Sequence, residues 1–127
     1  MQTLEENNMG MPLDVLMCLS ACDQKASQEN VHLYRGLIAE EYDEFCQAVI
    51  MRDEPEQLDA CMDMIWVILG YCHMKGYNIA GAWDEVVGTN MAKVDPLTGK
   101  VRRREDGKIL KPEGWAPPDM TKFLKKN

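Results

Sequence analysis

Apolar residues recur at helical spacing through most of the chain, and short polar stretches interrupt this pattern three times. The periodicity predicts four helices, which cover residues of about 13–25, 31–51, 54–74 and 79–93. The inward-facing residues expected in the first helix are Leu13, Leu16, Met17 and Leu19. The expected fold class is therefore all-α, a four-helix bundle followed by a tail of different character.

Capping residues mark the ends of the later helices. Asp53 is placed to cap the third helix, Pro55 suits its first turn, and Glu56 completes the spacing of a capping box. Gly76 is a stop signal for the same helix, and Asn78 can cap the fourth.

Turn signals replace the helical pattern after residue 93. The turn-forming pairs are Asp95-Pro96, Thr98-Gly99 and Asp106-Gly107. Because the last pair separates residues 101–104 from residues 108–110, it predicts a small hairpin. We expect a helical core over residues 1–93 and a basic hairpin and tail over residues 94–127, within one domain.

Two glutamates fall on the apolar face of the second predicted helix. Glu41 and Glu44 follow Leu37 by four and seven residues, so all three share one side of a helix. Glu40 falls nearer the edge of this face. A glutamate at such an edge is commonly solvated, but two within the face require another explanation.

Two aspartates of the third predicted helix raise the same question. Asp63 lies in a segment, residues 60–69, that is apolar on nearly every side, and Asp59 precedes it by one turn. A buried carboxylate without a partner costs several kcal/mol or stays protonated. No lysine or arginine lies within reach on either helix. A divalent cation resolves the conflict, and an all-oxygen ligand set suits Mg²⁺ or Mn²⁺; the alternative is that Asp63 bonds a group that the sequence does not reveal.

Charge is distributed unevenly along the chain. The net charge is −7, yet residues 1–92 hold sixteen acidic residues against four basic ones, and residues 93–127 hold ten basic residues against five acidic ones. An acidic body argues against a nucleic-acid-binding domain, which needs a basic face.

Composition also bears on location and on the cysteines. No apolar segment is long enough to span a bilayer, and the N-terminus lacks the pattern of a signal peptide, so we expect a cytoplasmic protein. The five cysteines contain no CxxC pair and are expected to be free thiols. A soft-metal site at Cys18 and Cys22, or at Cys72 beside His73, is a minor alternative.

At its acidic residues the sequence resembles the all-α nucleoside triphosphate pyrophosphohydrolases of the MazG-like superfamily. Members carry EExxE on one helix and ExxD on the next. Residues 40–44 match the first motif, whereas Asp59 and Asp63 form DxxxD because Ala60 stands where the second motif has glutamate. Residues 83–93, which end in Asn-Met-Ala-Lys, and the basic residues 99–118 resemble the phage and bacterial, phosphoribosyl-ATP pyrophosphohydrolase-like branch.

This resemblance, over residues of about 31–118, implies a magnesium- or manganese-dependent enzyme that converts a (deoxy)nucleoside triphosphate to the monophosphate and pyrophosphate. The metal ligands would be Glu41, Glu44, Asp59 and Asp63. The catalytic residues would be Glu40, Glu41 and Glu44, with Glu40 or Glu44 orienting or deprotonating the attacking water. The substrate-binding residues would be Asn90, Lys93, Arg102, Arg103 and Arg104, although the three arginines are equally compatible with a solvated hairpin.

The same branch favours a deoxynucleotide substrate, with a purine base, in a phage or bacterial setting, and the host cytoplasm if the protein is viral. We expect a homodimer or homotetramer, because four short helices with ten methionines would expose apolar surface if left alone. No membrane or nucleic-acid partner is expected. Two rival functions stay open: a non-catalytic nucleotide- or metal-binding regulator that lost activity with the change at Ala60, and a helical interaction module whose basic tail binds nucleic acid.

Overall fold

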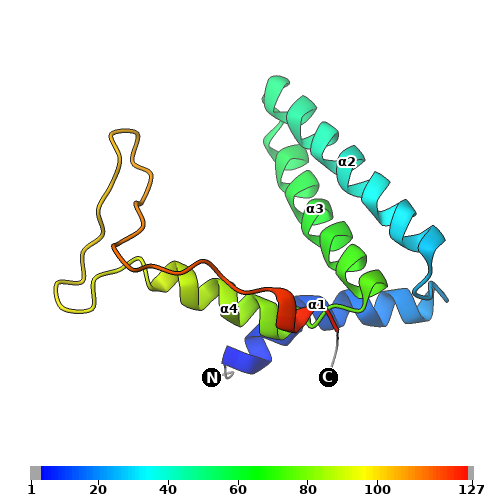
Figure 1. Ribbon diagram of the computed structural model, residues 1–127. Helices are drawn as coiled ribbons and strands as arrows, with labels where there is room; N and C mark the ends of the chain where they lie inside the picture. Colours follow the sequence, from blue (N-terminus) through cyan, green and yellow to red (C-terminus); the bar gives the residue numbers. More distant parts are fainter. Residues whose placement is uncertain (1–3, 126–127) are drawn as a thin grey trace.

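Within residues 4–125, four α-helices and one short 3-10 helix make up the regular structure, seen in the computed structural model of Figure 1. The structure describes the backbone of residues 4–125 and the side chains from residue 10 to residue 125. The elements are α1 (Leu4–Ala21), α2 (Gln28–Ile50), α3 (Glu54–Lys75), α4 (Ile79–Met91) and η1 (Thr121–Phe123). The described residues contain no strand, so the predicted all-α class is confirmed.

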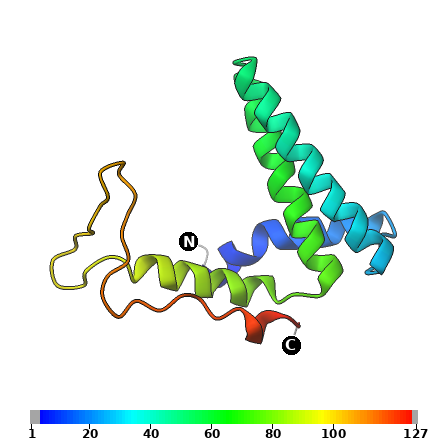
Figure 2. The same ribbon diagram turned by 45° about the horizontal axis from the view of Figure 1, so that its top comes forward.

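The helices pack as a bundle in two pairs. α2 and α3 form an antiparallel hairpin, and their contact is the most extensive one between two helices. α1 and α4 lie across the base of this hairpin, where α1 contacts both α3 and α4 (Figures 1 and 2). No helix in the described part of the chain has the length and apolar character needed to cross a membrane.

The predicted caps explain where α3 and α4 begin and where α3 ends. The Asp53 carboxylate accepts a hydrogen bond from the Glu56 amide at 3.1 Å, and the Asn78 side chain accepts one from the Gly81 amide at 3.1 Å. Gly76 follows α3 with a φ of 73°, in the left-handed region that favours glycine. These three predictions are confirmed.

α1 differs from its prediction at both ends. It begins at Leu4 instead of near residue 13, and it continues through Pro12. It ends at Ala21 instead of near residue 25, and Asp23 then adopts a left-handed φ of 54°. A proline suits a helix start better than a helix interior, which is why the sequence pattern placed the start too late.

The face that α1 buries also differs from the prediction. Its buried residues are Val15 and Leu19, one turn apart, at 1% and 4% exposure. Leu13, Leu16 and Met17 are 44%, 39% and 62% exposed, so their predicted inward placement is wrong. Because α1 is apolar around much of its circumference, periodicity alone does not select the side that packs.

Tyr34 and Gly70 hold α2 against α3. The Tyr34 side chain is buried, and a Cβ added at Gly70 would overlap its ring. Its hydroxyl donates a hydrogen bond to the side-chain oxygen of Gln24 at 2.6 Å. Val67 and Met74 of α3 join the same core cluster.

The C-terminal region first leaves α4 as a hairpin and then returns along it. Arg103 and Ile109 form an antiparallel bridge around the turn at Gly107, whose φ is 91°, so the predicted hairpin is present in a minimal form. In the returning segment, the Trp115 indole donates a hydrogen bond to the Thr89 carbonyl at 2.7 Å. We call residues 95–110 the basic hairpin and residues 111–123 the strap.

Candidate active site

The predicted metal ligands come from the two helices that pack most closely, Glu41 and Glu44 from α2 and Asp59 and Asp63 from α3. The antiparallel pairing explains why they meet. Glu44 and Asp59 lie about equally far from the turn between the helices, and so do Glu41 and Asp63. We call these four residues the acidic cluster.

Glu41 gives the strongest indication that the four carboxylates interact with one another. The pKa of Glu41 is raised from 4.5 to about 7, chiefly by burial, then by a hydrogen bond with Glu44 and by the negative charges of Glu44, Asp63 and Asp59. Its Oε2 atom is buried and has no hydrogen-bond partner. The surroundings of the Glu41 carboxyl therefore disfavour its ionised form unless a cation binds next to it.

Asp63 and Asp59 also interact. Burial raises the pKa of Asp63, and the charges of Asp59 and Glu44 and a hydrogen bond with Asp59 raise it further. Asp59 thus contributes to the electrostatics of both half-buried acids, Glu41 and Asp63. This supports the interpretation that Asp59 takes the place of the glutamate missing at Ala60.

The acidic cluster fits a divalent cation by the chemistry of its donors. All four side chains offer hard carboxylate oxygens, which Mg²⁺ and Mn²⁺ prefer. Within residues 10–125 no ion pair neutralises any of the four, since the pairs found there involve Asp23, Asp106 and Glu85. Among these same residues, however, no three His, Cys, Asp or Glu side chains are already arranged to hold a metal ion. Repulsion between like charges keeps such side chains apart, so the carboxylates would have to draw together around the ion.

Two further positions of the motifs differ in their surroundings. Glu40 is exposed at the edge of α2, where it is accessible to solvent. Ala60 has 0% exposure, so this methyl group is fully enclosed. A glutamate at position 60 would have to displace its neighbours.

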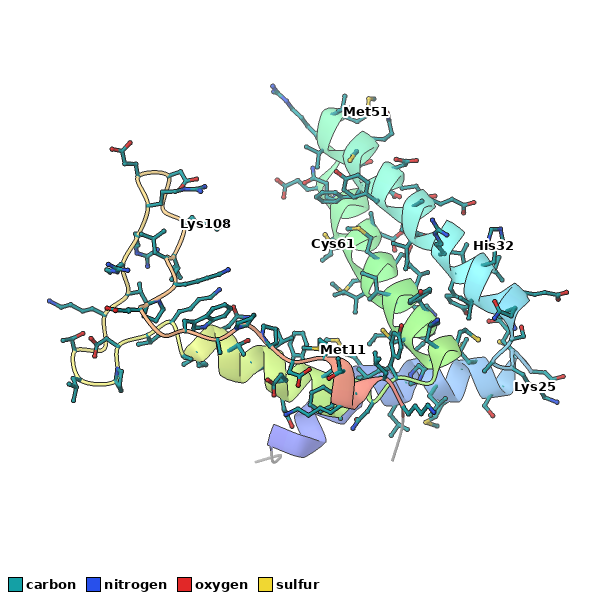
Figure 3. The ribbon with its side chains drawn as sticks, viewed as in Figure 1. Met11, Lys25, His32, Met51, Cys61 and Lys108 are labelled. Atoms are coloured by element: carbon teal, nitrogen blue, oxygen red, sulfur yellow. The ribbon has the colours of Figure 1, made fainter. Side chains whose placement is uncertain are left out.

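The predicted substrate-binding residues lie away from the acidic cluster. At the end of α4, the Lys93 ammonium donates a hydrogen bond to the Asn90 side-chain oxygen at 3.0 Å. Arg102, Arg103 and Arg104 belong to the basic hairpin, which extends from the C-terminal end of α4 and stands apart from the α2–α3 hairpin (Figures 1 and 2). Figure 3 shows the same separation, with Lys108 in the basic hairpin and Cys61 between the two aspartates of α3. One copy of the chain therefore brings the carboxylates together but keeps them apart from the predicted phosphate-binding groups.

The three arginines are not equivalent. Arg104 pairs with Asp106 through two of its guanidinium nitrogens, Nε and Nη2. Arg103 donates a hydrogen bond to the Gly107 carbonyl at 3.3 Å, and Arg102 donates one to the Lys111 carbonyl at 3.5 Å. The Asp106 carboxylate thus neutralises Arg104 within the turn.

Trp115 and Lys111 are residues to which sequence reasoning gave no role. The Lys93 and Lys111 ammonium groups lie 5.5 Å and 4.9 Å from the centroid of the Trp115 ring. A tryptophan between several basic residues is a visible signal, but the contact itself depends on how the strap returns along α4.

A helical hairpin that carries four facing carboxylates, with one buried and unpartnered oxygen on Glu41, is typical of metal-dependent enzymes of phosphate chemistry. Residues 20–90, more than half of the chain, match the phosphoribosyl-ATP pyrophosphohydrolase family. The chain therefore belongs to this family, within the MazG-like all-α nucleoside triphosphate pyrophosphohydrolases. Its members are pyrophosphohydrolases that act on acid anhydrides and generally depend on Mg²⁺. Among curated proteins, no sequence matches the chain.

The matched segment contains the whole acidic cluster and Asn90, and it ends before Lys93. The family assignment therefore supports a pyrophosphohydrolase acting on a substrate of the nucleoside triphosphate type. It leaves the basic hairpin and the strap to be interpreted from their own structure.

Proposed function

We propose that the chain hydrolyses the bond between the α- and β-phosphates of a nucleoside triphosphate, releasing a nucleoside monophosphate and pyrophosphate. The observation that carries this proposal is the acidic cluster, in which Glu41 keeps a buried carboxyl oxygen without a partner. A site with excess negative charge is suited to a cation that arrives together with a triphosphate.

The carboxylates would divide the chemistry between them. Glu41, Glu44, Asp59 and Asp63 would hold Mg²⁺ or Mn²⁺, which when bound would neutralise phosphate oxygens and make a water more acidic. Glu40 or Glu44, both exposed on α2, would orient the attacking water and accept its proton. As the water oxygen bonds to one of the two phosphorus atoms, the bridging P–O bond breaks and its electron pair leaves with the other product, which is pyrophosphate for attack on the α-phosphorus and the monophosphate for attack on the β-phosphorus.

Substrate binding would fall to groups outside the acidic cluster. Asn90 and Lys93, which bond each other at the end of α4, would contact the sugar, the base or the phosphates. Arg102, Arg103 and Arg104 would neutralise the outer phosphates through charge-assisted hydrogen bonds. We further propose a deoxypurine triphosphate as the preferred substrate, in a phage or bacterial cell.

The test is a panel of ribo- and deoxynucleoside triphosphates, with phosphoribosyl-ATP included, incubated with the full chain and Mg²⁺. Pyrophosphate and monophosphate should appear together in equal amounts, and Asp63→Asn should abolish both. Asp43→Asn, a change to an exposed acid of α2 outside the acidic cluster, should leave turnover intact. Release of inorganic phosphate instead of pyrophosphate would refute the proposed bond.

The change at Ala60 favours one other function, a regulator that binds nucleotide and metal without cleaving. Equilibrium binding of the same nucleotides, measured with Mg²⁺, separates the two. Tight binding with no product from any substrate of the panel would favour the regulator.

A further inference from the structure

Three cations of the C-terminal region gather around one aromatic ring. The Lys93 and Lys111 ammonium groups lie 5.5 Å and 4.9 Å from the centroid of the Trp115 ring. The Arg102 guanidinium donates a hydrogen bond to the Lys111 carbonyl at 3.5 Å, which brings a third cation to the base of the basic hairpin. We call Lys93, Arg102, Lys111 and Trp115 the Trp115 cluster.

The Trp115 ring gives the two ammonium groups a fixed support. Its indole donates a hydrogen bond to the Thr89 carbonyl at 2.7 Å, which ties the strap to α4. The face of an indole ring attracts cations, because the ring carries a negative potential there. Trp115 therefore offsets part of the repulsion that would otherwise drive the Lys93 and Lys111 ammonium groups apart.

No carboxylate pairs with these three cations among the residues that the structure describes, since the ion pairs found there involve Lys25, Arg104 and Lys122. Their hydrogen-bond donors are also incompletely used. A lysine ammonium carries three donor hydrogens, and the bond from Lys93 to the Asn90 side chain takes one of them. The Trp115 cluster thus offers both positive charge and donors to an anion.

The surroundings of the Trp115 cluster favour a chain of phosphate groups. Ammonium and guanidinium groups bind phosphate oxygens through charge-assisted hydrogen bonds, and three such groups around one ring can contact more than one phosphate. The ring borders a groove of about 690 Å³ between α4 and the strap, which leaves room for a ligand. Asp84, Glu85 and Glu113 also line this groove, so an anion gains energy only where the cations of the Trp115 cluster lie.

We propose that the Trp115 cluster is a polyphosphate-binding site in which Lys111 binds phosphate oxygens together with Lys93 and Arg102, and Trp115 positions the two ammonium groups. The site needs no metal ion, because its positive charge comes from the side chains themselves. Lys111 and Trp115 lie outside residues 20–90, so the family match does not cover them. The inference rests on the proposed function only for the identity of the ligand, which under that function is the triphosphate chain of the nucleotide.

Isothermal titration calorimetry with inorganic tripolyphosphate tests the site on the full chain without turnover. EDTA removes metal ions, and a fixed low ionic strength keeps screening constant. Wild type should bind, and Lys111→Gln should raise the dissociation constant about tenfold, as expected for the loss of one charge-assisted hydrogen bond.

Lys108→Gln is the matched control, because it removes the same charge from the basic hairpin outside the Trp115 cluster. It should change the dissociation constant less than about twofold, and both variants should keep the wild-type melting temperature. Absence of binding by wild type would overturn the proposal. Equal weakening in the two variants would also overturn it, because it would show a general attraction to the basic region instead of a site.

Trp115 supplies a second readout that a general loss of charge would not change. Tripolyphosphate should alter the tryptophan fluorescence of wild type, because the ammonium groups over the ring move towards the phosphates. Trp115→Phe keeps an aromatic ring, so it should still bind in calorimetry but lose this fluorescence change. Trp115→Leu, which lacks a ring, should bind about fivefold more weakly than wild type. A fluorescence change that persists in Trp115→Phe, or wild-type affinity in Trp115→Leu, would overturn the proposal.

Nucleotide turnover separates this proposal from the proposed function. In the pyrophosphate-release assay, Lys111→Gln should raise KM about tenfold and change kcat less than about twofold, since Lys111 binds phosphates without taking part in bond cleavage. A wild-type KM in Lys111→Gln would overturn the proposal and leave the function standing. A chain that binds tripolyphosphate as described but hydrolyses no nucleotide would refute the function and leave the site standing.

Discussion

Replacing Glu41 with glutamine should stabilise the metal-free protein at and above neutral pH. The Glu41 carboxyl sits among three other carboxylates and is partly shielded from water, so its charged form is unfavourable in the folded state. Glutamine keeps nearly the same shape and never takes the charge. The variant thus removes the free-energy cost of ionising Glu41 in the folded protein.

The size of the effect follows from the pKa of Glu41. A rise from 4.5 to about 7 corresponds to an upper limit of about 3.5 kcal/mol, at about 1.4 kcal/mol per pKa unit. Because the side chain is only half-buried, solvent screening reduces this figure. We expect a difference of about 1–2 kcal/mol in the free energy of unfolding.

The sign of the pH dependence is fixed by the direction of the change. In the unfolded chain Glu41 ionises near its ordinary pKa of 4.5, and in the folded chain it ionises near 7. Its contribution to stability is therefore fully present below pH 4.5 and is lost as the pH rises through 7. Wild type and Glu41→Gln should have equal stability at the acidic end of this window, and the variant should become the more stable of the two above it.

Urea unfolding from about pH 4.5 to about pH 8, with EDTA present throughout, measures this difference. Asp43→Asn is the matched control, since it removes an exposed acid from the same helix, and its difference from wild type should not grow with pH in this way. A Glu41→Gln variant that is less stable than wild type at about pH 8 would refute the argument, and so would a difference that does not change with pH.

Three other predictions follow from the same geometry. Millimolar Mg²⁺ should raise the melting temperature measured by differential scanning fluorimetry. The rise should be larger at about pH 8 than at about pH 5.5, because a proton must leave the acidic cluster before the ion binds. Equal rises at the two pH values would contradict this. Gly70→Ala should destabilise the chain by about 1–3 kcal/mol in urea unfolding, because the new Cβ meets the Tyr34 ring, whereas Gly36→Ala has open space and should be neutral or stabilising. Asp59→Ala should lose pyrophosphate release and most of the Mg²⁺-induced rise in melting temperature, and a fully active Asp59→Ala would show that three carboxylates suffice. Ala60→Glu should lower the melting temperature, because position 60 is fully enclosed.

The parts of the fold that sequence predicted well are those set by neighbouring residues. Asp53, Gly76 and Asn78 act through hydrogen bonds and backbone angles within one turn, so their spacing was enough to locate the ends of α3 and the start of α4. The hairpin turn at Gly107 is local in the same sense. The pairing of the carboxylates was also accessible, because the antiparallel α2–α3 hairpin follows from two helices joined by a short turn.

The parts that sequence missed depend on long-range contacts. The Trp115 ring meets Lys93 only because the strap returns along α4, twenty-two residues later in the chain. The buried face of α1 is decided by where α3 and α4 lie, not by its own pattern. The exposure of Met62 and Trp66 was missed for the same reason. An apolar helix predicts that its side chains are buried, but its sequence does not show which of them another segment covers.

The change from ExxD to DxxxD has a geometric consequence for the acidic cluster. At 100° per residue, position 60 lies about 60° to one side of Asp63 around the helix axis, and position 59 lies about 40° to the other side. Position 60 is enclosed and position 59 is exposed. The ligand role has therefore passed from the enclosed side of Asp63 to its open side, if Asp59 serves as proposed. A cation held there would lie nearer the surface of the α2–α3 hairpin, where the phosphates of a substrate can reach it. The exchange of one acidic position for its neighbour is thus consistent with a shift of the site towards the open face of α3.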